Sequence, residues 1–300
     1  MLQQFDERNK VLLVNINGDL IHRDQAGISP FDSAVQGGDA VWEGLRLYEG
    51  KIFRLEEHLD RLRRSARALA FAKIPSIEEL IAEIRKTLEA NQMVDGVHIR
   101  LTLTRGIKIT SGMDPRLNQS GPTLIVLAEF KSPVYRKDGL TFVTSSIRRF
   151  PPDCLDPNIH HNNLIQSILA KIEANAAGAD SALMLDRQGF VAEAHGTHIF
   201  LVRSGTVLTP TTEACPEGIT RQTVLDLCKD HGLSYWEQKL SMTSVYTADE
   251  IFCTGTMGEI AAVTRVDGRT VSDGTVGPIT KKMSEWYAHE TASSGYPILM

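Results

Sequence analysis

The sequence has little of what marks several common protein classes. Its 300 residues include four cysteines, without a Cys-x-x-Cys pair, and aromatic residues make up 6%. Such widely spaced cysteines predict reduced thiols packed as small apolar groups. No apolar run has the length of a membrane span, and residues 1–8 are too polar for a signal peptide. We therefore expect a cytoplasmic protein with no membrane partner.

Charge of one sign is not in excess either. The formal net charge is −5 and the sequence pI is about 6.0, so nothing favours nucleic acid as a partner. A hydrophobic content of 42% with 23% charged residues is ordinary for a globular protein. A chain of this length fills one large or two medium domains. We see no internal repeat and no low-complexity segment.

Strand and helix patterns alternate along the chain and indicate two domains. Hairpin signals such as Asn17-Gly18 and Ser204-Gly205 lie between short apolar runs, with amphipathic helices elsewhere. Residues 131–138 combine charge with proline and precede a glycine, which is typical of a linker. We predict a small N-terminal α/β domain at 1–130, this linker, and a large C-terminal domain at 139–300. The fold class is α/β or α+β.

Two helices of the first domain are predicted from apolar stripes. The first stripe consists of Leu55, Leu59, Leu62, Ala66 and Leu69. The second consists of Ile77, Leu80, Ile81, Ile84 and Leu88. Arginines occupy other faces of the first helix, namely Arg61, Arg63, Arg64 and Arg67. We expect these arginine-rich faces to be solvated.

Residues 155–171 stand out because polar side chains sit where an apolar helix begins. An Asp-Pro turn leads into His160, His161, Asn162 and Asn163. Leu164, Ile168, Ile172 and Ala176 then recur at a spacing of four, which predicts a buried helix. Sites are often built at such helix starts.

Three local features favour a ligand that carries phosphate. Residues 216–221 place a glycine and a hydroxyl at a helix start, where free N–H groups and the helix dipole attract phosphate. An ordinary threonine N-cap explains the same residues. Residues 255–258 form a loop of small side chains at a strand end, and Arg54 can offer two donors to phosphate oxygens.

Taken together and in order, the motifs resemble the class IV (fold-type IV) aminotransferases, the family of branched-chain and D-amino-acid transaminases. The C-terminal half carries the resemblance at 216–223, 248–260, 266–271 and 277–280. The N-terminal half carries it at 41–46, 53–62 and 98–106. The family pattern D-P-x-I-K-x-x-N-x-L, followed by L-A-K, is matched here by Asp156, Pro157, Ile159, Asn163, Leu169, Ala170 and Lys171. The resemblance implies the two-domain D-amino acid aminotransferase-like fold, with the cofactor in the C-terminal domain.

The resemblance also implies pyridoxal 5'-phosphate (PLP) or pyridoxamine 5'-phosphate (PMP) as cofactor and assigns residues to it. Glu193 matches the glutamate that lies beside the pyridine nitrogen. The phosphate anchors match Arg54, Ile219, Thr220 and Thr256. Substrate contacts fall on Trp42, Arg100, Met257 and His198. The implied substrates are amino acids and 2-oxo acids, with branched apolar side chains favoured, and the implied assembly is a homodimer.

One departure from the family pattern bears directly on the chemistry. His160 occupies the position of the lysine that forms the Schiff base and moves the substrate proton. An imidazole has no primary amine, but it can move a proton near neutral pH. Ala194 and His198 replace a glycine and an asparagine, and Gly37 stands where several members have a tyrosine. Lys171 matches a second family lysine outside the site.

Four histidines, His160, His161, His195 and His198, lie in two segments that the implied fold brings near the cofactor. Their spacing matches no metal-ligand pattern, so we expect a polar pocket and no metal.

Three functions remain open. The first is a transaminase-like enzyme with noncovalent PLP or PMP; the second is an altered enzyme, with or without PLP. The third is a non-catalytic ligand binder. Retention of Glu193 and the phosphate anchors favours the first, whereas ordinary lysine-based transamination is not favoured.

Overall fold

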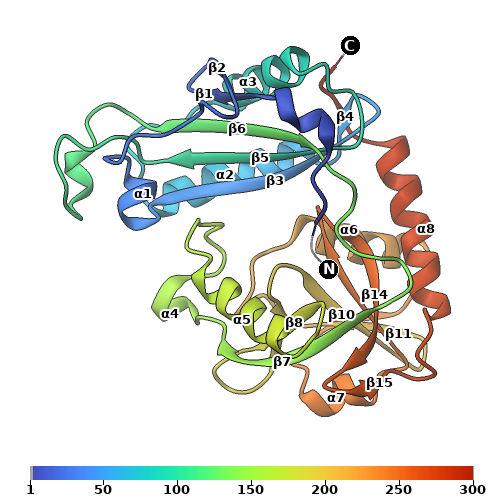
Figure 1. Ribbon diagram of the computed structural model, residues 1–300. Coiled ribbons are helices and arrows are strands. Elements are labelled where there is room, and N and C mark those ends of the chain that lie inside the picture. Colours follow the sequence, from blue (N-terminus) through green and yellow to red (C-terminus); the bar gives the residue numbers. More distant parts are fainter. Residues whose placement is uncertain (1–2, 300) are drawn as a thin grey trace. The chain divides into compact units, whose positions relative to one another are not determined.

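Residues 3–299 are described by a computed structural model and form two compact units (Figure 1). The seven-stranded unit contains residues 3–132, 159–163 and 291–299. The nine-stranded unit contains residues 133–158 and 164–290. None of the described helices has the length and apolar character that crossing a membrane requires.

The seven-stranded unit is an antiparallel sheet with its core between one face and two helices. The strand order is β16-β4-β3-β5-β6-β1-β2. The strands are β1 (Leu13–Ile16), β2 (Asp19–His22), β3 (Ala40–Tyr48), β4 (Lys51–Ile52), β5 (Val97–Thr104), β6 (Thr123–Phe130) and β16 (Tyr296–Pro297). The helices are α1 (Ser33–Gly37), α2 (Leu55–Ala68) and α3 (Ile77–Ala90), with the 3-10 turns η1 (Glu7–Val11) and η2 (Pro115–Leu117).

Helices α2 and α3 confirm the two apolar stripes. Leu55, Leu59 and Leu62 of α2 are buried in the core beneath the sheet. Leu80, Ile81, Ile84 and Leu88 of α3 are buried in the same core. The expectation that all the arginines of α2 are solvated is wrong for Arg61, which is 7% exposed. Its guanidinium is buried because it pairs with a carboxylate on β3, described below.

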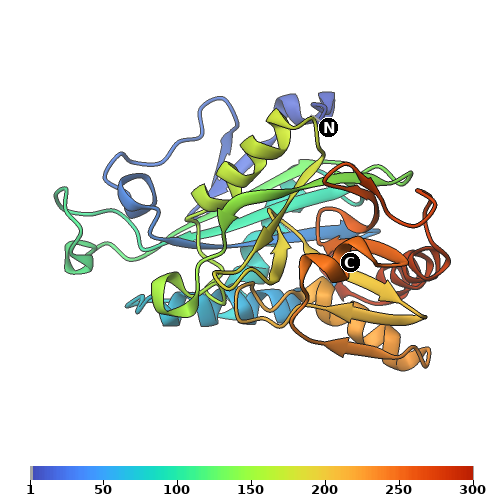
Figure 2. The ribbon, with the colours of Figure 1, turned by 90° about the horizontal axis from the view of Figure 1, so that it is seen from below.

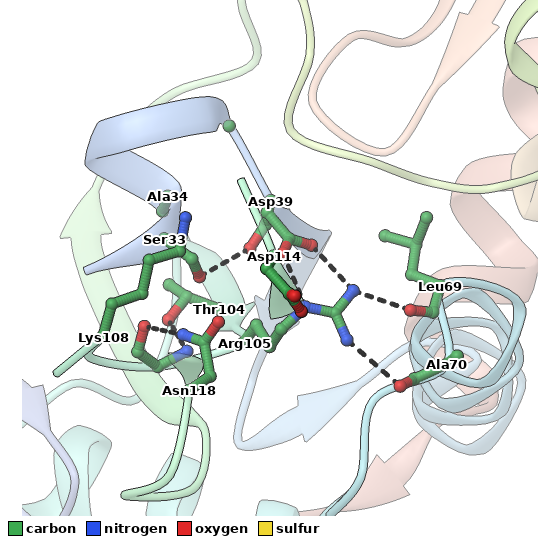
Figure 3. Close-up of polar contacts among 12 residues, drawn as sticks. Ser33, Ala34, Asp39, Leu69, Ala70, Thr104, Arg105, Lys108, Asp114 and Asn118 are labelled. Carbon is green, nitrogen blue, oxygen red and sulfur yellow. Dashed lines mark hydrogen bonds and ion pairs between the residues drawn. The ribbon is translucent and has the colours of Figure 1, made fainter. Parts of the chain in front are cut away.

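Arg105, which follows β5, forms hydrogen bonds with the residue before β3 and with the residues after α2 (Figure 3). Its Nε and Nη2 donate to both carboxylate oxygens of Asp39 at 2.6 and 3.1 Å. Its guanidinium also donates to the main-chain oxygens of Leu69 and Ala70, just after α2. These bonds fix the start of β3 relative to α2 and β5, which positions the residues of the candidate site.

The nine-stranded unit is a mixed sheet. The order is β12-β11-β10-β13-β14-β7-β8-β9, with β15 paired to β14, and β7 runs parallel to both β8 and β14. The strands are β7 (Leu140–Arg148), β8 (Ser181–Leu185), β9 (Val191–Ala194), β10 (His198–Arg203), β11 (Thr206–Thr209), β12 (Tyr235–Glu237), β13 (Glu250–Gly255), β14 (Glu259–Val266) and β15 (Arg269–Thr270). The helices are α4 (Pro152–Leu155), α5 (Ile165–Ala176), α6 (Ile219–Asp230), α7 (Met242–Tyr246) and α8 (Pro278–Ser293), whose last residues fall outside this unit.

Helix α5 packs along β7 and β8 (Figure 2). Its apolar stripe does not face the sheet. The prediction that Ile168 and Ile172 are buried is wrong, since they are 51% and 56% exposed. The buried side consists of Gln166, Ala170 and Ala174. Small alanine side chains allow the helix to approach the sheet closely, so the large side chains point outward.

Candidate functional site

The segment 159–163 lies on the open edge at the start of β3. Strand β4 is short, and its pairing with β3 is confined to the end of β3, at Leu47 and Tyr48. The start of β3 is paired instead with this segment, because Trp42 N donates to His160 O at 3.0 Å and Asn162 N donates to Ala40 O at 2.8 Å. These main-chain bonds satisfy groups that the short neighbour leaves open and hold residue 160 in a fixed place.

The His160 ring is held through Nδ1 and through one face. Nδ1 lies 2.5 Å from the main-chain oxygen of Trp42 and 3.4 Å from Oε1 of Glu43. The ring stacks on the Trp42 indole with centroids 4.4 Å apart and an angle of 27°. The His160 side chain keeps 16% exposure. Within the described residues, Nε2 makes no hydrogen bond.

Glu43 is the centre of a buried ion cluster. Arg61 donates to its two oxygens from Nε at 2.8 Å and from Nη2 at 2.7 Å, and His58 Nδ1 lies 2.6 Å from Oε2. Burial works to raise the pKa of Glu43, but Arg61 and then His160 hold that pKa well below its usual value. The carboxylate therefore stays ionised.

The same cluster shifts the pKa of the neighbouring His160 imidazole. Burial, and next the charge of Arg61, lower the pKa of His160, while Glu43 works in the opposite direction. We therefore expect a neutral His160 ring at neutral pH, able to accept a proton.

Trp42 and Arg100, both assigned to substrate contact, lie beside His160. The Arg100 guanidinium lies 3.6 Å from the centre of the Trp42 ring, and its Nη2 donates to Asn162 Oδ1 at 2.6 Å. Burial lowers the pKa of Arg100 to about 10, with Glu43 opposing, so the group remains cationic near neutral pH. A cation stacked on an indole in a partly desolvated place stabilises the pair by about 1–2 kcal/mol.

Arg54, assigned to the phosphate, begins α2 in the same unit. Its backbone is left-handed, with φ of 52°, and no side chain caps the helix there. Its Nη1 donates to Glu57 at 3.0 Å, and 34% of the side chain is exposed. The guanidinium thus lies at the positive end of the α2 dipole, where anions are favoured.

Glu193 lies on β9 of the nine-stranded unit with Arg149 as its ion partner. Arg149 Nη2 is 2.8 Å from Oε1 of Glu193. Burial raises the pKa of Glu193 to about 7, and Arg149 opposes that shift. Arg149 Nη1 also donates to Gln166 Oε1 at 3.3 Å and Ser167 Oγ at 3.4 Å, at the start of α5. A cationic partner fixed in this way favours the ionised form of Glu193.

Helix α6 begins without a side-chain cap. Gly218 is the N-cap residue, and Thr220 lies inside the helix, so the threonine N-cap considered from sequence is not how this helix starts. Among the described residues, the amide groups of Ile219 and Thr220 donate to no acceptor outside the helix. Such a first turn can bind an anion through its N–H groups.

His198 packs against this helix start. Its Nε2 donates to the Pro216 main-chain oxygen at 2.8 Å. A Cβ placed on Gly218 would overlap the His198 ring. His198 thus supports the loop that leads into α6, and residue 218 has to be a glycine for that ring to fit.

We expect Gly218→Ala to lower the stability of the protein by about 1–3 kcal/mol, since the added methyl forces a buried ring to move. Thermal or urea unfolding measures the loss. Gly196→Ala is the matched control because the same unit leaves open space at that position. His198→Ala in the Gly218→Ala background should recover part of the loss, and no recovery would contradict the proposed steric cause.

Thr256 and Met257 form the turn between β13 and β14. Both are partly exposed. The main-chain oxygen of Met257 accepts a hydrogen bond from Val134 N at 3.1 Å. Gly258 has no room for a side chain because the Tyr135 ring packs on it. Residues 134–135 therefore fix one side of this turn.

The candidate residues thus form separate groups. The seven-stranded unit brings together His160, Trp42 and Arg100 and also contains Arg54; the nine-stranded unit brings together His198, Ile219 and Thr220 and also contains Glu193, Thr256 and Met257. His195 belongs to the nine-stranded unit and His161 to the other. Over residues 3–299 no group of three or more His, Cys, Asp or Glu side chains could hold a metal ion.

Sequence reasoning missed Glu43, Arg61 and Arg149 as parts of these groups. Glu43 lies within the family-like segment 41–46, which was a usable signal. Arg61 followed the helix spacing of a solvated residue, and Arg149 carried no signal at all. Their partners are distant in the sequence, and periodicity reports only local neighbours.

Comparison with known proteins identifies the family. The pattern described as amino-transferase class IV matches residues 40–266, and the chain belongs to this family. Branched-chain-amino-acid aminotransferase-like protein 2 of Arabidopsis thaliana is 51% identical over 97% of this chain, but the match covers 52% of that protein. The chain thus spans about half the length of this relative. A putative branched-chain-amino-acid aminotransferase of Methanocaldococcus jannaschii is 41% identical over 91% of this chain and 94% of its own.

Solved structures confirm the fold class. The T.th. branched-chain amino acid aminotransferase, complexed with N-(5'-phosphopyridoxyl)-L-glutamate, superposes with a TM-score of 0.88 at 33% identity, covering 96% of this chain and 95% of that one. The Escherichia coli branched-chain enzyme gives 0.87 at 30% identity, covering 93% and 94%. The fold is therefore the fold-type IV aminotransferase fold, with two sheets in a mixed α/β arrangement.

Proposed function

We propose that this branched-chain aminotransferase-like chain binds PLP or PMP noncovalently and acts on amino acids and 2-oxo acids. Two solved structures of the T.th. branched-chain amino acid aminotransferase support the cofactor, one complexed with N-(5'-phosphopyridoxyl)-L-glutamate and one with pyridoxamine 5'-phosphate. A third structure of the same enzyme is complexed with 4-methylvaleric acid, which supports a branched apolar substrate. A homodimer is part of the same proposal.

The buried carboxylate of Glu193 carries this proposal. A carboxylate with 6% exposure costs free energy unless a cation faces it, and Arg149 Nη2 lies 2.8 Å from Oε1 of Glu193. A protonated pyridine nitrogen would supply a second cationic partner for this buried carboxylate. The uncapped start of α6 suits the phosphate, through the amides of Ile219 and Thr220. The residues of the nine-stranded unit therefore fit the cofactor.

When bound, the cofactor supplies an electron sink for the bond to the substrate Cα. The protein residues then bind and orient. Glu193 would hold the pyridine nitrogen protonated, and Arg54 and Thr256 would hold phosphate oxygens. Arg100 would hold the substrate carboxylate beside Trp42. His160 would move the proton but has no primary amine with which to attach the cofactor.

Absorption spectra of the purified protein titrated with PLP test this proposal. We expect uptake of PLP, with the spectrum of a free aldehyde and no protein adduct after borohydride reduction. An amino-acid panel should convert part of the bound PLP to PMP, with branched-chain amino acids ahead of charged ones.

Peptide mapping and two variants provide the controls for this test. A reduced adduct on any lysine would contradict noncovalent binding, and mapping would name that lysine. No uptake of PLP or PMP would contradict the whole proposal and favour an altered enzyme or binder. Glu193→Gln should retain PLP but lose most of the conversion to PMP, whereas the exposed Glu213→Gln should change neither.

A further inference from the structure

The hydrogen bonds of the His160 ring determine which of its nitrogens carries the proton. Nδ1 lies 2.5 Å from the main-chain oxygen of Trp42, and a carbonyl oxygen can only accept. The second neighbour of Nδ1 is the Glu43 carboxylate at 3.4 Å, which also accepts. Both contacts therefore require a hydrogen on Nδ1.

A neutral imidazole carries one N–H hydrogen, so placing it on Nδ1 leaves Nε2 with a lone pair. Nε2 has no hydrogen-bond partner within the described residues, and the side chain keeps partial exposure. Stacking on Trp42 hinders rotation of the ring, which would exchange the two nitrogens. The ring thus presents one defined basic atom.

We propose that Glu43 and the Trp42 carbonyl lock His160 in the Nδ1–H tautomer, which makes Nε2 the atom that takes up and returns the substrate proton. Glu43 is then a positioning residue that acts through His160. The proton leaves the substrate Cα and binds to the Nε2 lone pair, while the electron pair of the broken C–H bond stays with the substrate–cofactor system. This inference rests on the proposed function.

Several charged groups around Glu43 suit it to this task. From α2, Arg61 occupies both oxygens and His58 contacts Oε2. From β5, Arg100 lies on the Trp42 ring that stacks with His160. The Arg61 guanidinium keeps Glu43 ionised, and the ionised carboxylate favours the doubly protonated ring that exists once Nε2 has taken a proton. Glu43 therefore helps to fix which nitrogen of His160 carries the proton, and it raises the basicity of the ring.

Nitrogen NMR of the full chain labelled with ¹⁵N-histidine tests the tautomer without cofactor. His160→Gln assigns the resonances of residue 160 by their loss. We expect a protonated Nδ1 and a bare Nε2 at neutral pH, unlike free histidine, which favours the other tautomer. A proton on Nε2, or a doubly protonated ring at neutral pH, would overturn the proposal. Because PLP is absent, this result is independent of whether the proposed function holds.

Glu43→Gln tests the positioning role, with His58→Gln as matched control, because His58 contacts the other oxygen of Glu43. In Glu43→Gln the ring should become less basic, and the acidic limb of the kcat profile should move to lower pH. The kcat itself should fall by about 10²-fold with KM little changed. His58→Gln should leave the nitrogen signals of His160 as in the wild type. An unshifted profile and unchanged His160 signals in Glu43→Gln would overturn the role of Glu43.

Discussion

Replacing His160 with lysine is expected to give a PLP adduct at residue 160 that borohydride reduces to a stable bond. The backbone already holds this position through main-chain bonds to β3, so a lysine there begins from a fixed place. Its amine can reach the region of Nε2, and Arg61 nearby favours the neutral, nucleophilic form. Conversion of amino acids should rise, because the lysine amine adds covalent attachment of the cofactor at a position where His160 offers only a basic nitrogen.

Two controls separate attachment from proton transfer. His160→Gln has neither an amine nor a basic nitrogen, so it should retain PLP but lose the conversion that His160 supports. Lys171→Arg in the His160→Lys background should leave the adduct intact, because Lys171 Nζ is bound to the Asp180 main-chain oxygen at 2.6 Å. An adduct that disappears with Lys171→Arg would show that position 160 is not where the cofactor attaches.

Removing Glu43 is expected to lower stability more than most single substitutions. Glu43→Ala leaves the Arg61 charge buried without its carboxylate, which typically costs about 3–5 kcal/mol. Urea unfolding should show a lower midpoint with little change in slope. Asp60→Asn is the control, at an exposed position of α2, the helix that contains Arg61. It should change stability by less than about 0.5 kcal/mol.

A double variant tests the cause of that loss. Arg61→Met together with Glu43→Gln removes both charges, so no uncompensated ion remains in the core. This pair should be more stable than Glu43→Ala alone, even though it lacks more native contacts. Equal or lower stability of the double variant would mean that packing, and not the unpaired charge, dominates.

Local patterns predicted the elements well. The stripe that begins at Leu55 became α2, the stripe that begins at Ile77 became α3, and Ser204-Gly205 connects β10 to β11. The family-like motifs also gave the fold correctly. Hydrophobic periodicity works here because each stripe is buried on one continuous face.

The same reasoning failed where a neighbour decides the outcome. In α5 the alanines, and not the isoleucines, face the sheet, because a close helix–sheet contact admits only small side chains. Arg61 is buried because Glu43 lies opposite, although the spacing along α2 predicts solvent exposure. Arg149 meets Glu193 only through the fold of the nine-stranded unit. Such pairs depend on tertiary contacts that a single sequence does not encode by spacing.

The seven-stranded unit consists of three segments that are far apart in the sequence, and this has a consequence for protein synthesis. Residues 159–163 complete the edge of β3, and β16 at 296–297 pairs with β4. A ribosome therefore releases β16 only after the whole nine-stranded unit has been synthesised. Residues 3–132 are synthesised before residues 159–163 and 296–297, so their sheet has an unpaired edge until then, and such an edge is a known site of aggregation. Expression of residues 1–132 alone should accordingly yield a fragment that needs the remaining chain, supplied in trans, to become a stable domain.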